Sequence, residues 1–389
     1  MDRTKWERKR FDEVFDLQMG KTPDRKDYSY FGGDNVWVSI RDLTDKYIVE
    51  SNEKITDKAL DDTGIKVVKK GTVIMSFKLT VGKCGIAAKD LYTNEAIMAF
   101  NLREGYMLDS SFLYYYLQGY HWEGANKAVM GITLNKATIS KQHIQLPSLS
   151  DQQAIVTELD KLNEVVALKR KQLADLDSLA QSLFYEMCGD PVVNEKGWEI
   201  KQLGELALVK TGPFGSMLHK DDYISNGVPL VNPVHMKNFQ VVADKEFSIS
   251  QEMAERLKDY SLKTNDVVFA RRGDIGRCAV ITEKENGYLC GTGSLFVRFG
   301  TDISPVFILF IIRSASFTRE LISKAKGATM LNLNSTTISE LRIPLPPLPL
   351  QQSFAAKVAK IEAEKQRVKA SLKDLEMLLA SRMQYWFDS

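Results

Sequence analysis

The chain contains one segment twice, and this repeat limits the folds that the sequence can adopt. Residues 134–153 read LNKATISKQHIQLPSLSDQQ, and residues 333–352 read LNSTTISELRIPLPPLPLQQ. The two segments are identical at 11 of 20 positions, and equivalent residues lie 199 positions apart. This spacing is far longer than that of solenoid repeats, which recur about every 20–50 residues. The repeat therefore predicts two copies of one half-protein.

Two further pairs of segments extend the duplication through each half. Residues 6–20 (WERKRFDEVFDLQMG) resemble residues 198–212 (WEIKQLGELALVKTG), and residues 81–87 (VGKCGIA) resemble residues 275–281 (IGRCAVI). The offset between the copies grows from 192 to 194 and then to 199. The second copy has therefore gained a few residues, which we expect in surface loops, where insertions cost little.

Each half begins with a part in which strand patterns and helical patterns mix. Helical patterns surround residues 111–118 and 306–324. The strand patterns are four runs separated by Gly, Asn and Asp, namely NVWVSI (35–40), GTVIMSF (71–77), DVVFARR (266–272) and SLFVRF (294–299). This mixture predicts an α+β domain in each half.

A long helical stretch follows each proline-containing repeat. From 151 to 188 the chain contains no Gly or Pro, and its apolar residues alternate in spacing between four and three, as in a heptad seam. The apolar residues of the predicted seam are 155, 159, 162, 166, 173, 176, 183 and 187 in the first copy, and 354, 358, 361, 368, 372, 375, 379 and 386 in the second. Lys169 and Ala180 fill the two gaps in the first copy, and Lys365 and Arg382 interrupt the second. Such a stripe can also pack on its own domain, but its unbroken length favours a coiled coil between the two helices. We expect Ser150 and Asp151 to cap the first helix.

The predicted architecture is an α+β fold with two duplicated mixed α/β domains. Two long helices separate the domains and form an antiparallel intramolecular coiled coil with pseudo-twofold symmetry. The expected boundaries are 1–147 for the first domain, 148–189 for the proline junction and first helix, 190–346 for the second domain, and 347–389 for the second junction and helix. Such a chain resembles a DNA-binding dimer, whose symmetry sets the spacing of two half-sites. Because the copies have diverged, the half-sites should differ in sequence.

Composition and charge narrow the possible functions. The net charge is +2, and no domain or helix departs from neutrality by more than three charges, so a protein that coats DNA nonspecifically is excluded. No apolar run reaches about 18 residues and no signal sequence opens the chain, so we expect a cytoplasmic protein without a membrane partner. The four cysteines and four histidines lack the spacing of a metal site.

The repeated segment, each time followed by a long helix, resembles the specificity subunits of type I DNA restriction–modification systems. Its pattern is L-x-x-x-x-I-x-x-x-x-I-x-L-P-x-L-x-x-Q-Q. Residues 211–232, which include TGPFGSMLHKDDY and GVPLVN, are similar to the start of a target-recognition domain in that family. The resemblance covers the whole chain, although the first domain has MGKTP (19–23) in place of TGPFGS.

The resemblance implies a subunit that catalyses no reaction itself. It would read a bipartite, asymmetric target in double-stranded DNA with a nonspecific spacer. It would carry two adenine methyltransferase subunits, which restriction translocase–endonuclease subunits then join. S-adenosylmethionine, ATP and Mg²⁺ would bind to these partners, and no cofactor would bind to this chain.

The absence of enzyme motifs in the sequence agrees with this interpretation. It contains neither the [DNS]-P-P-[FYW] tetrapeptide of amino-methyltransferases nor a G-x-x-x-x-G-K-[ST] phosphate loop. The alternative that stays open is a scaffold or regulatory protein that does not bind DNA and whose duplicated helices bind other proteins.

The candidate DNA contacts are polar side chains in loops that follow strand patterns. Arg and Lys pair with guanine and Asn and Gln with adenine, whereas Lys, Arg, Ser and Thr also bind phosphates. The strongest group lies in ARRGDIGRC (270–278), which is equivalent to SFKLTVGKC (76–84). The candidates are Ser39, Arg41, Lys78, Thr80, Lys83, Asn126 and Lys127 in the first copy, and Ser216, His219, Lys220, Asn232, His235, Arg271, Arg272, Arg277, Lys324 and Lys326 in the second. Two alternatives to DNA contact remain for these residues. The charged side chains can simply be solvated on hairpins, and the turns can have a purely structural role.

Overall fold

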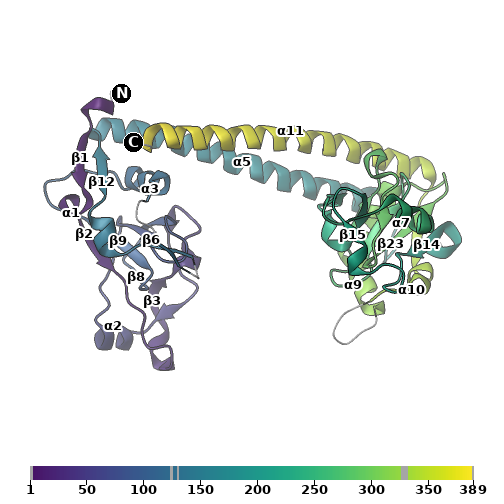
Figure 1. Cartoon of the computed structure of the whole chain (residues 1–389), viewed down its shortest axis with the longest axis horizontal. Helices are drawn as coiled ribbons and strands as arrows, with labels where there is room; N and C mark the ends of the chain where they lie inside the picture. Colours follow the sequence, from purple (N-terminus) through teal and green to yellow (C-terminus); the bar gives the residue numbers. More distant parts are fainter. Residues whose placement is uncertain (1–2, 123–125, 129–130, 326–331, 388–389) are drawn as a thin grey trace. The chain divides into compact units, whose positions relative to one another are not determined.

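The computed structural model describes residues 3–122, 126–128, 131–325 and 332–387 (Figure 1). The chain divides into two compact units, one formed by residues 1–170 with 370–389 and the other by residues 171–369. Each unit therefore contains the beginning of one long helix and the end of the other.

The first unit contains a five-stranded sheet with the order β2-β9-β6-β7-β4. Its strands are β2 (Phe15–Met19), β9 (Ile97–Leu102), β6 (Val73–Ser76), β7 (Cys84–Ala87) and β4 (Tyr47–Ile48). A three-stranded sheet with the order β5-β3-β8 consists of β5 (Lys54–Ile55), β3 (Phe31–Val38) and β8 (Tyr92–Thr93), in which β3 and β8 are parallel. The other elements are β1 (Glu7–Arg10), α1 (Phe11–Val14), α2 (Asp57–Thr63), α3 (Ser110–Gly119), β10 (Asn126–Ala128), β11 (Gly131–Thr133), α4 (Lys136–Ser140) and β12 (His143–Leu146).

The second unit contains a four-stranded sheet with the order β14-β23-β20-β21. Its strands are β14 (Ala207–Thr211), β23 (Ser294–Phe299), β20 (Val267–Ala270) and β21 (Cys278–Val280). A second sheet has the order β15-β19-β16-β22, with β15 (Tyr223–Ile224), β19 (Ser248–Ile249), β16 (Val228–Val231) and β22 (Leu289–Cys290). The other elements are β13 (Glu199–Gln202), α6 (Leu203–Leu206), β17 (Met236–Lys237), β18 (Gln240–Val241), α7 (Gln251–Arg256), α8 (Pro305–Arg313), α9 (Ala315–Lys324), α10 (Ser335–Ser339) and β24 (Arg342–Leu345).

The two units repeat one topology, which confirms the predicted duplication of an α+β domain. Strands β2, β9, β6 and β7 correspond in order and direction to β14, β23, β20 and β21. The parallel pair β3–β8 corresponds to β16–β22, and the closing pair β1–β12 corresponds to β13–β24. One difference from the predicted pattern is that residues 306–324 form two helices, because the buried Ser314 ends α8 and caps α9.

The tyrosines of α3 belong to the core of the first unit. Tyr115 and Tyr116 are buried, and Tyr114 packs against the same cluster. These rings therefore stabilise the domain and offer no stacking surface to a base.

Polar residues that both copies of the repeated segment share make equivalent contacts in the two units. The Asn135 side chain accepts a hydrogen bond from the Thr138 backbone N–H (2.8 Å) and caps α4, and Asn334 caps α10 in the same way through Thr337 (2.7 Å). An asparagine at this position satisfies an N–H group that the helix itself leaves free. Part of the repeat is thus explained by two equivalent helix caps.

The first glutamine of each Gln-Gln pair is a buried link between a long helix and its domain. Gln152 accepts a hydrogen bond from the Asp109 N–H (2.8 Å) and donates one to the Pro147 carbonyl (3.0 Å). Gln351 makes the equivalent bonds to the Ser304 N–H (3.0 Å) and the Pro346 carbonyl (2.8 Å). Both glutamines are 1% exposed, so an unpaired amide at either position would be costly.

The two long helices are α5 (Leu149–Cys188) and α11 (Leu348–Phe387), and within each unit their segments pack antiparallel (Figure 1). In the first unit Glu158 binds Arg382, and Arg170 binds Glu376 at 2.7 Å. In the second unit Asp177 binds Lys365 at 2.7 Å. Residue numbers thus rise along α5 as they fall along α11, which confirms the predicted antiparallel pair.

The predicted seam is half-buried or buried from residue 155 to residue 176 of α5, and along α11. Near the end of α5, Phe184 and Cys188 are more deeply buried than the predicted seam residues 183 and 187. The reason is that this part of the helix packs in the core of the second unit. The predicted cap of α5 was wrong, since the helix begins at Leu149 and the Ser148 hydroxyl accepts from the Asp151 N–H (3.2 Å). Ser150 and Asp151 lie inside the first turn. No helix of the described part of the chain is long and apolar enough to cross a membrane.

Candidate nucleic-acid interface

Several of the loops with predicted DNA contacts converge at one edge of each domain. Strands β14 and β20 are both antiparallel to β23, so they end at the same edge, and β16 and β22 are parallel to each other. In the second unit the loops that follow these strands are 212–220, 232–235, 271–277 and 291–293. In the first unit the equivalent loops follow β2, β6, β3 and β8.

Hydrogen bonds join these loops in the second unit. The Asn232 side chain accepts from the Gly293 N–H (3.3 Å), and Arg277 donates to the Pro233 carbonyl (3.1 Å). Arg277 also forms an ion pair with Asp274. The loops therefore form one connected surface. The side chains of the predicted DNA contacts Asn232 and Arg277 already form hydrogen bonds that stabilise this surface.

Arg271 and Arg272 lie side by side in sequence but in different surroundings. Arg271 is 5% exposed, and its Nε donates to the Thr292 carbonyl (3.1 Å). Burial, and then the charge of Arg272, lower the pKa of Arg271. Its equivalent in the first unit is the buried Phe77. Arg271 therefore supports the loop from inside, whereas Arg272 is exposed.

The turns after β6 and β20 have the same backbone and different side chains. Leu79 and Gly82 have φ values of 65° and 88°, and their equivalents Gly273 and Gly276 have 73° and 97°. The polar positions on these turns are Lys78, Thr80 and Lys83 in the first unit and Arg272, Asp274 and Arg277 in the second. Thr80 and Lys83 are exposed, whereas Asp274 and Arg277 bind each other.

In the first unit the edge encloses a hollow of about 510 Å³. Its walls include the predicted contacts Ser39, Arg41 and Thr80, together with Glu95 from the loop after β8. An ion pair between Arg25 and Glu53 (2.7 Å) lies in the same wall. Three predicted residues from two distant segments are thus brought together.

The turns 39–42 and 232–235 show which side chains face outward. Asp42 accepts from the Ser39 N–H (2.7 Å), and the equivalent His235 Nδ1 accepts from the Asn232 N–H (3.1 Å). His235 is 3% exposed, and burial lowers its pKa, so its ring holds the turn and lies away from the surface. The exposed residue of the second turn is Val234, which corresponds to Arg41 and which no polar pattern would have indicated.

The other predicted contacts occupy varied positions. Ser216 and His219 are exposed in the loop after β14, beside Phe214, which is 60% exposed. Lys324 ends α9 and binds Glu320 (3.3 Å). Lys326 lies outside the described residues, as do the side chains of Asn126, Lys127 and Lys220.

The described residues offer no metal-binding cluster. No three His, Cys, Asp or Glu side chains among them are placed to hold a metal ion. All four cysteines are buried, and burial raises the pKa of Cys188 to about 11 and that of Cys278 to about 12.

Two copies of one domain with different side chains at equivalent loop positions define a recognition protein with two different binding surfaces. Residues 3–178 and 195–375 match the model of a family described as the type I restriction modification DNA specificity domain. The chain belongs to this family, and it recognises the DNA target within a type I restriction–modification complex without itself catalysing a reaction.

Relatives support this assignment along most of the chain. The chain is 26% identical over 380 residues to the MjaIX specificity subunit of Methanocaldococcus jannaschii, which covers 90% of this chain and 85% of the relative. It is 22% identical over 249 residues to the StySPI specificity subunit of Salmonella potsdam, across 59% of this chain and 52% of that one.

Solved structures show the same fold. A chain from a study of complex assembly and conformational transition in the type I R-M system has a TM-score of 0.66 and 18% identity, covering 98% of this chain and 97% of its own. The S subunit from M. genitalium has a TM-score of 0.54 and 15% identity, covering 97% and 95%.

Proposed function

We propose that the loop edge of each unit reads one half of a bipartite, asymmetric DNA target whose halves are separated by a nonspecific spacer. The supporting observation is that equivalent loop positions carry different side chains on a shared backbone. Lys78 corresponds to Arg272, and Arg41 corresponds to Val234. Two recognition surfaces with the same backbone geometry but different side chains suit two half-sites of different sequence.

The chemistry of these side chains suits base edges in the major groove. The Arg272 guanidinium can donate two hydrogen bonds to guanine, and Val234 can contact the methyl group of thymine. In the first unit, Glu95 can accept from the amino group of cytosine, while Arg41 can bind guanine. Lys83 and Ser216 are exposed nearby and suit phosphates, which position the protein without reading the sequence.

We further propose that two adenine methyltransferase subunits bind this chain and that restriction translocase–endonuclease subunits join them. These partners would bind S-adenosylmethionine, ATP and Mg²⁺, and the assembly would act on double-stranded DNA in the cytoplasm. The supporting observation is a pair of residues that the repeat retains in both copies, Leu149 with Gln153 and Leu348 with Gln352, of which Leu348 is half-buried and the other three are exposed.

These residues have no evident role in the fold of their own units. In each pair the two residues are four apart and share a helix face, and among the described contacts their side chains make no hydrogen bond. In the second unit Leu348 and Gln352 line a hollow of about 510 Å³. An exposed surface that stays the same while the DNA-facing loops diverge suits a partner that binds twice.

The exchange of one recognition module tests the proposal. We take residues 1–147 and 190–346 as the modules, and residues 195–346 would be replaced by the matching segment of a relative with another target. Methylated adenines are then mapped in cells that contain the complete system. We expect one half-site to change and the other to stay the same, and a change in both or in neither would contradict modular reading.

A gel-shift assay distinguishes this function from that of a scaffold. The chain is assayed with and without its methyltransferase partner on duplexes that contain the mapped site or a scrambled site. We expect selective binding by the assembled complex. Equal binding to both duplexes in both assays would support a scaffold whose domains contact protein.

A further inference from the structure

Arg313, at the end of α8, lacks an acidic partner among the described residues. Its guanidinium lies over the rings of Phe239 (3.8 Å to the ring centroid) and Phe310 (4.5 Å). Asp177 and Glu362 act on it only at longer range, and both are ion-paired with Lys365 at 2.7 Å. A half-buried guanidinium held between rings without a carboxylate is suited to an anion from outside the chain.

The equivalent place in the first unit contains its own ion pair. Lys46, which corresponds to Phe239, binds Asp160 at 2.6 Å and lies over the Tyr115 ring at 4.8 Å. The residue of α11 that corresponds to Asp160 is Ala359. The second unit therefore has a cation at this place but lacks the carboxylate that neutralises the cation of the first unit.

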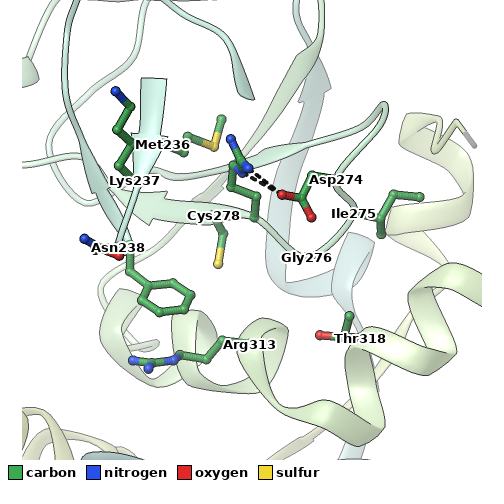
Figure 2. Close-up of a pocket in the computed structure, with 11 residues that line it drawn as sticks. Met236, Lys237, Asn238, Asp274, Ile275, Gly276, Cys278, Arg313 and Thr318 are labelled. Carbon is green, nitrogen blue, oxygen red and sulfur yellow. Dashed lines mark hydrogen bonds and ion pairs between the residues drawn. The ribbon is translucent and has the colours of Figure 1, made fainter. Parts of the chain in front are cut away.

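Arg313 faces an open cavity of about 670 Å³ between β17, the 274–278 loop and α9 (Figure 2). Lys237, Arg277 and Arg313 line it, and its carboxylate, Asp274, is bound by Arg277. The cavity therefore has an excess of positive charge. Figure 2 shows Arg313 below the turn at Asn238 and opposite Thr318, with the Asp274 ion pair across the cavity.

The hairpin above Arg313 has an unusual backbone. Asn238 and Phe239 have φ values of 50° and 62° and connect β17 to β18 through a two-residue turn. Asparagine is common in such turns, but a bulky residue with positive φ is rare, and glycine is the usual second residue. The Phe239 ring lies on the guanidinium, so the strained residue holds Arg313 in place.

We propose that this cavity binds one phosphate of the DNA backbone beside the second half-site, with Arg313 as its main ligand. The proposal rests on the DNA-reading function proposed above. It follows because the loop that carries Arg272 also forms the cavity wall through residues 274–277. A phosphate next to the bases that Arg272 contacts would then meet Arg313 and Lys237.

Salt dependence of DNA binding tests the proposal with the chain assembled with its methyltransferase. The variants are Arg313→Gln, which removes the charge, and Arg319→Gln, which removes an exposed charge from the next helix. We expect Arg313→Gln to weaken binding to cognate and scrambled duplexes by a similar factor, roughly 3–10. The slope of log affinity against log salt concentration should become shallower by about one unit. Arg319→Gln should change neither quantity.

A second experiment changes the DNA and compares the wild-type complex with the Arg313→Gln complex. Single neutral methylphosphonate linkages are placed one at a time along the cognate duplex. We expect one position beside the second half-site to weaken binding by the wild-type complex but not by the Arg313→Gln complex. Arg313→Lys, which retains the charge, should restore the salt slope if the glutamine variant folds poorly.

Three results would overturn the proposal. The first is an unchanged salt slope for Arg313→Gln, and the second is the absence of a sensitive phosphate in the wild-type complex. The third is loss of methyltransferase binding by Arg313→Gln with unchanged salt dependence, which would assign the cavity to a carboxylate of the partner. Failure of the DNA-reading function itself is distinguishable, since the wild-type complex would then not prefer its cognate duplex.

Discussion

Arg271 and Arg272 are adjacent in sequence, but the first is buried and the second is exposed. Arg271 occupies the place of Phe77, and both backbones form the same bonds, through N–H groups to Gly293 and Ala96 and through carbonyls to Leu333 and Leu134. Arg272 corresponds to Lys78 and is exposed. Of the two arginines, we therefore assign base contact to Arg272.

We expect Arg272→Ala to weaken cognate binding by about 1–3 kcal/mol and to relax discrimination at one position of the second half-site. The reason is the loss of a bidentate donor for guanine. Binding measured on duplexes with each base at each position would check this. Arg271→Ala serves as the comparison, because it should lower the melting temperature of the complex more than Arg272→Ala does. An Arg272→Ala complex with unchanged affinity and unchanged salt dependence would remove the loop from the interface.

At the scale of elements, the helix pair contains an ion pair whose strength depends on pH. Arg382, and then Trp386, donate hydrogen bonds to Glu158 and hold the pKa of its carboxyl below the usual value. A carboxyl with a lowered pKa stabilises the folded state above its unfolded pKa, about 4.3, and this contribution disappears as the pH falls through the folded value.

We expect Glu158→Gln to lower the free energy of unfolding by about 0.5–1 kcal/mol at pH 7, since both partners are about one-third exposed. The difference from the wild type should shrink as the pH falls below about 4. Denaturant unfolding at several pH values measures both effects. Glu376→Gln, in the more exposed pair with Arg170, is a control that should cost less. A difference that stays constant down to pH 3 would contradict the assigned role of the charge.

The helices were predictable in more detail than the loops. Heptad spacing depends only on which residues are apolar, so most of the seam followed from the sequence. The cap was misplaced by two residues because Ser148 and Ser150 are both good capping residues, and only the path of the chain after Pro147 decides between them. The shift to Phe184 and Cys188 arises from tertiary packing with the second core.

The loops were predictable as a set, but the direction of each side chain was not. The pattern of polar residues after strands identified loops that do converge, yet it did not show that His235 faces inward or that Val234 faces outward. The same sequence is compatible with either orientation. A polar side chain in a turn can point into solvent, or it can form a hydrogen bond with the backbone of the turn itself. Alignment of the two copies could have predicted the orientation of His235, because His235 aligns with Asp42, whose side chain caps the equivalent turn of the first unit.

At the scale of the whole molecule, α5 runs without a break from the first unit into the second. An insertion of seven residues near Lys169 retains the heptad seam and lengthens the helix by about 10 Å, which is the length of about three base pairs. We expect the same two half-sites with a longer nonspecific spacer. Methylation mapping in cells with the insertion variant measures the spacer.

The spacer should grow by less than the added helix length, because each added base pair also rotates the second half-site around the duplex and α11 keeps its original length. A matched variant with four inserted residues breaks the heptad and should lower stability. A stable seven-residue variant that methylates the original site with its original spacer would show that α5 does not set the distance.

The closing residues of the chain belong to the core of the unit that begins it. Trp386 stacks on Trp6 with 6.3 Å between ring centroids, and Phe387 packs against Phe112 at 5.7 Å. During synthesis, the ribosome releases these two aromatic residues only after both recognition domains have been translated. The first unit therefore completes its core only when Trp386 and Phe387 have been translated, whereas the residues of the second unit are all present once residue 369 has been translated. A nonsense codon at position 386 would thus remove two aromatic side chains from the core of the first unit, although the mutation follows the second domain in the gene.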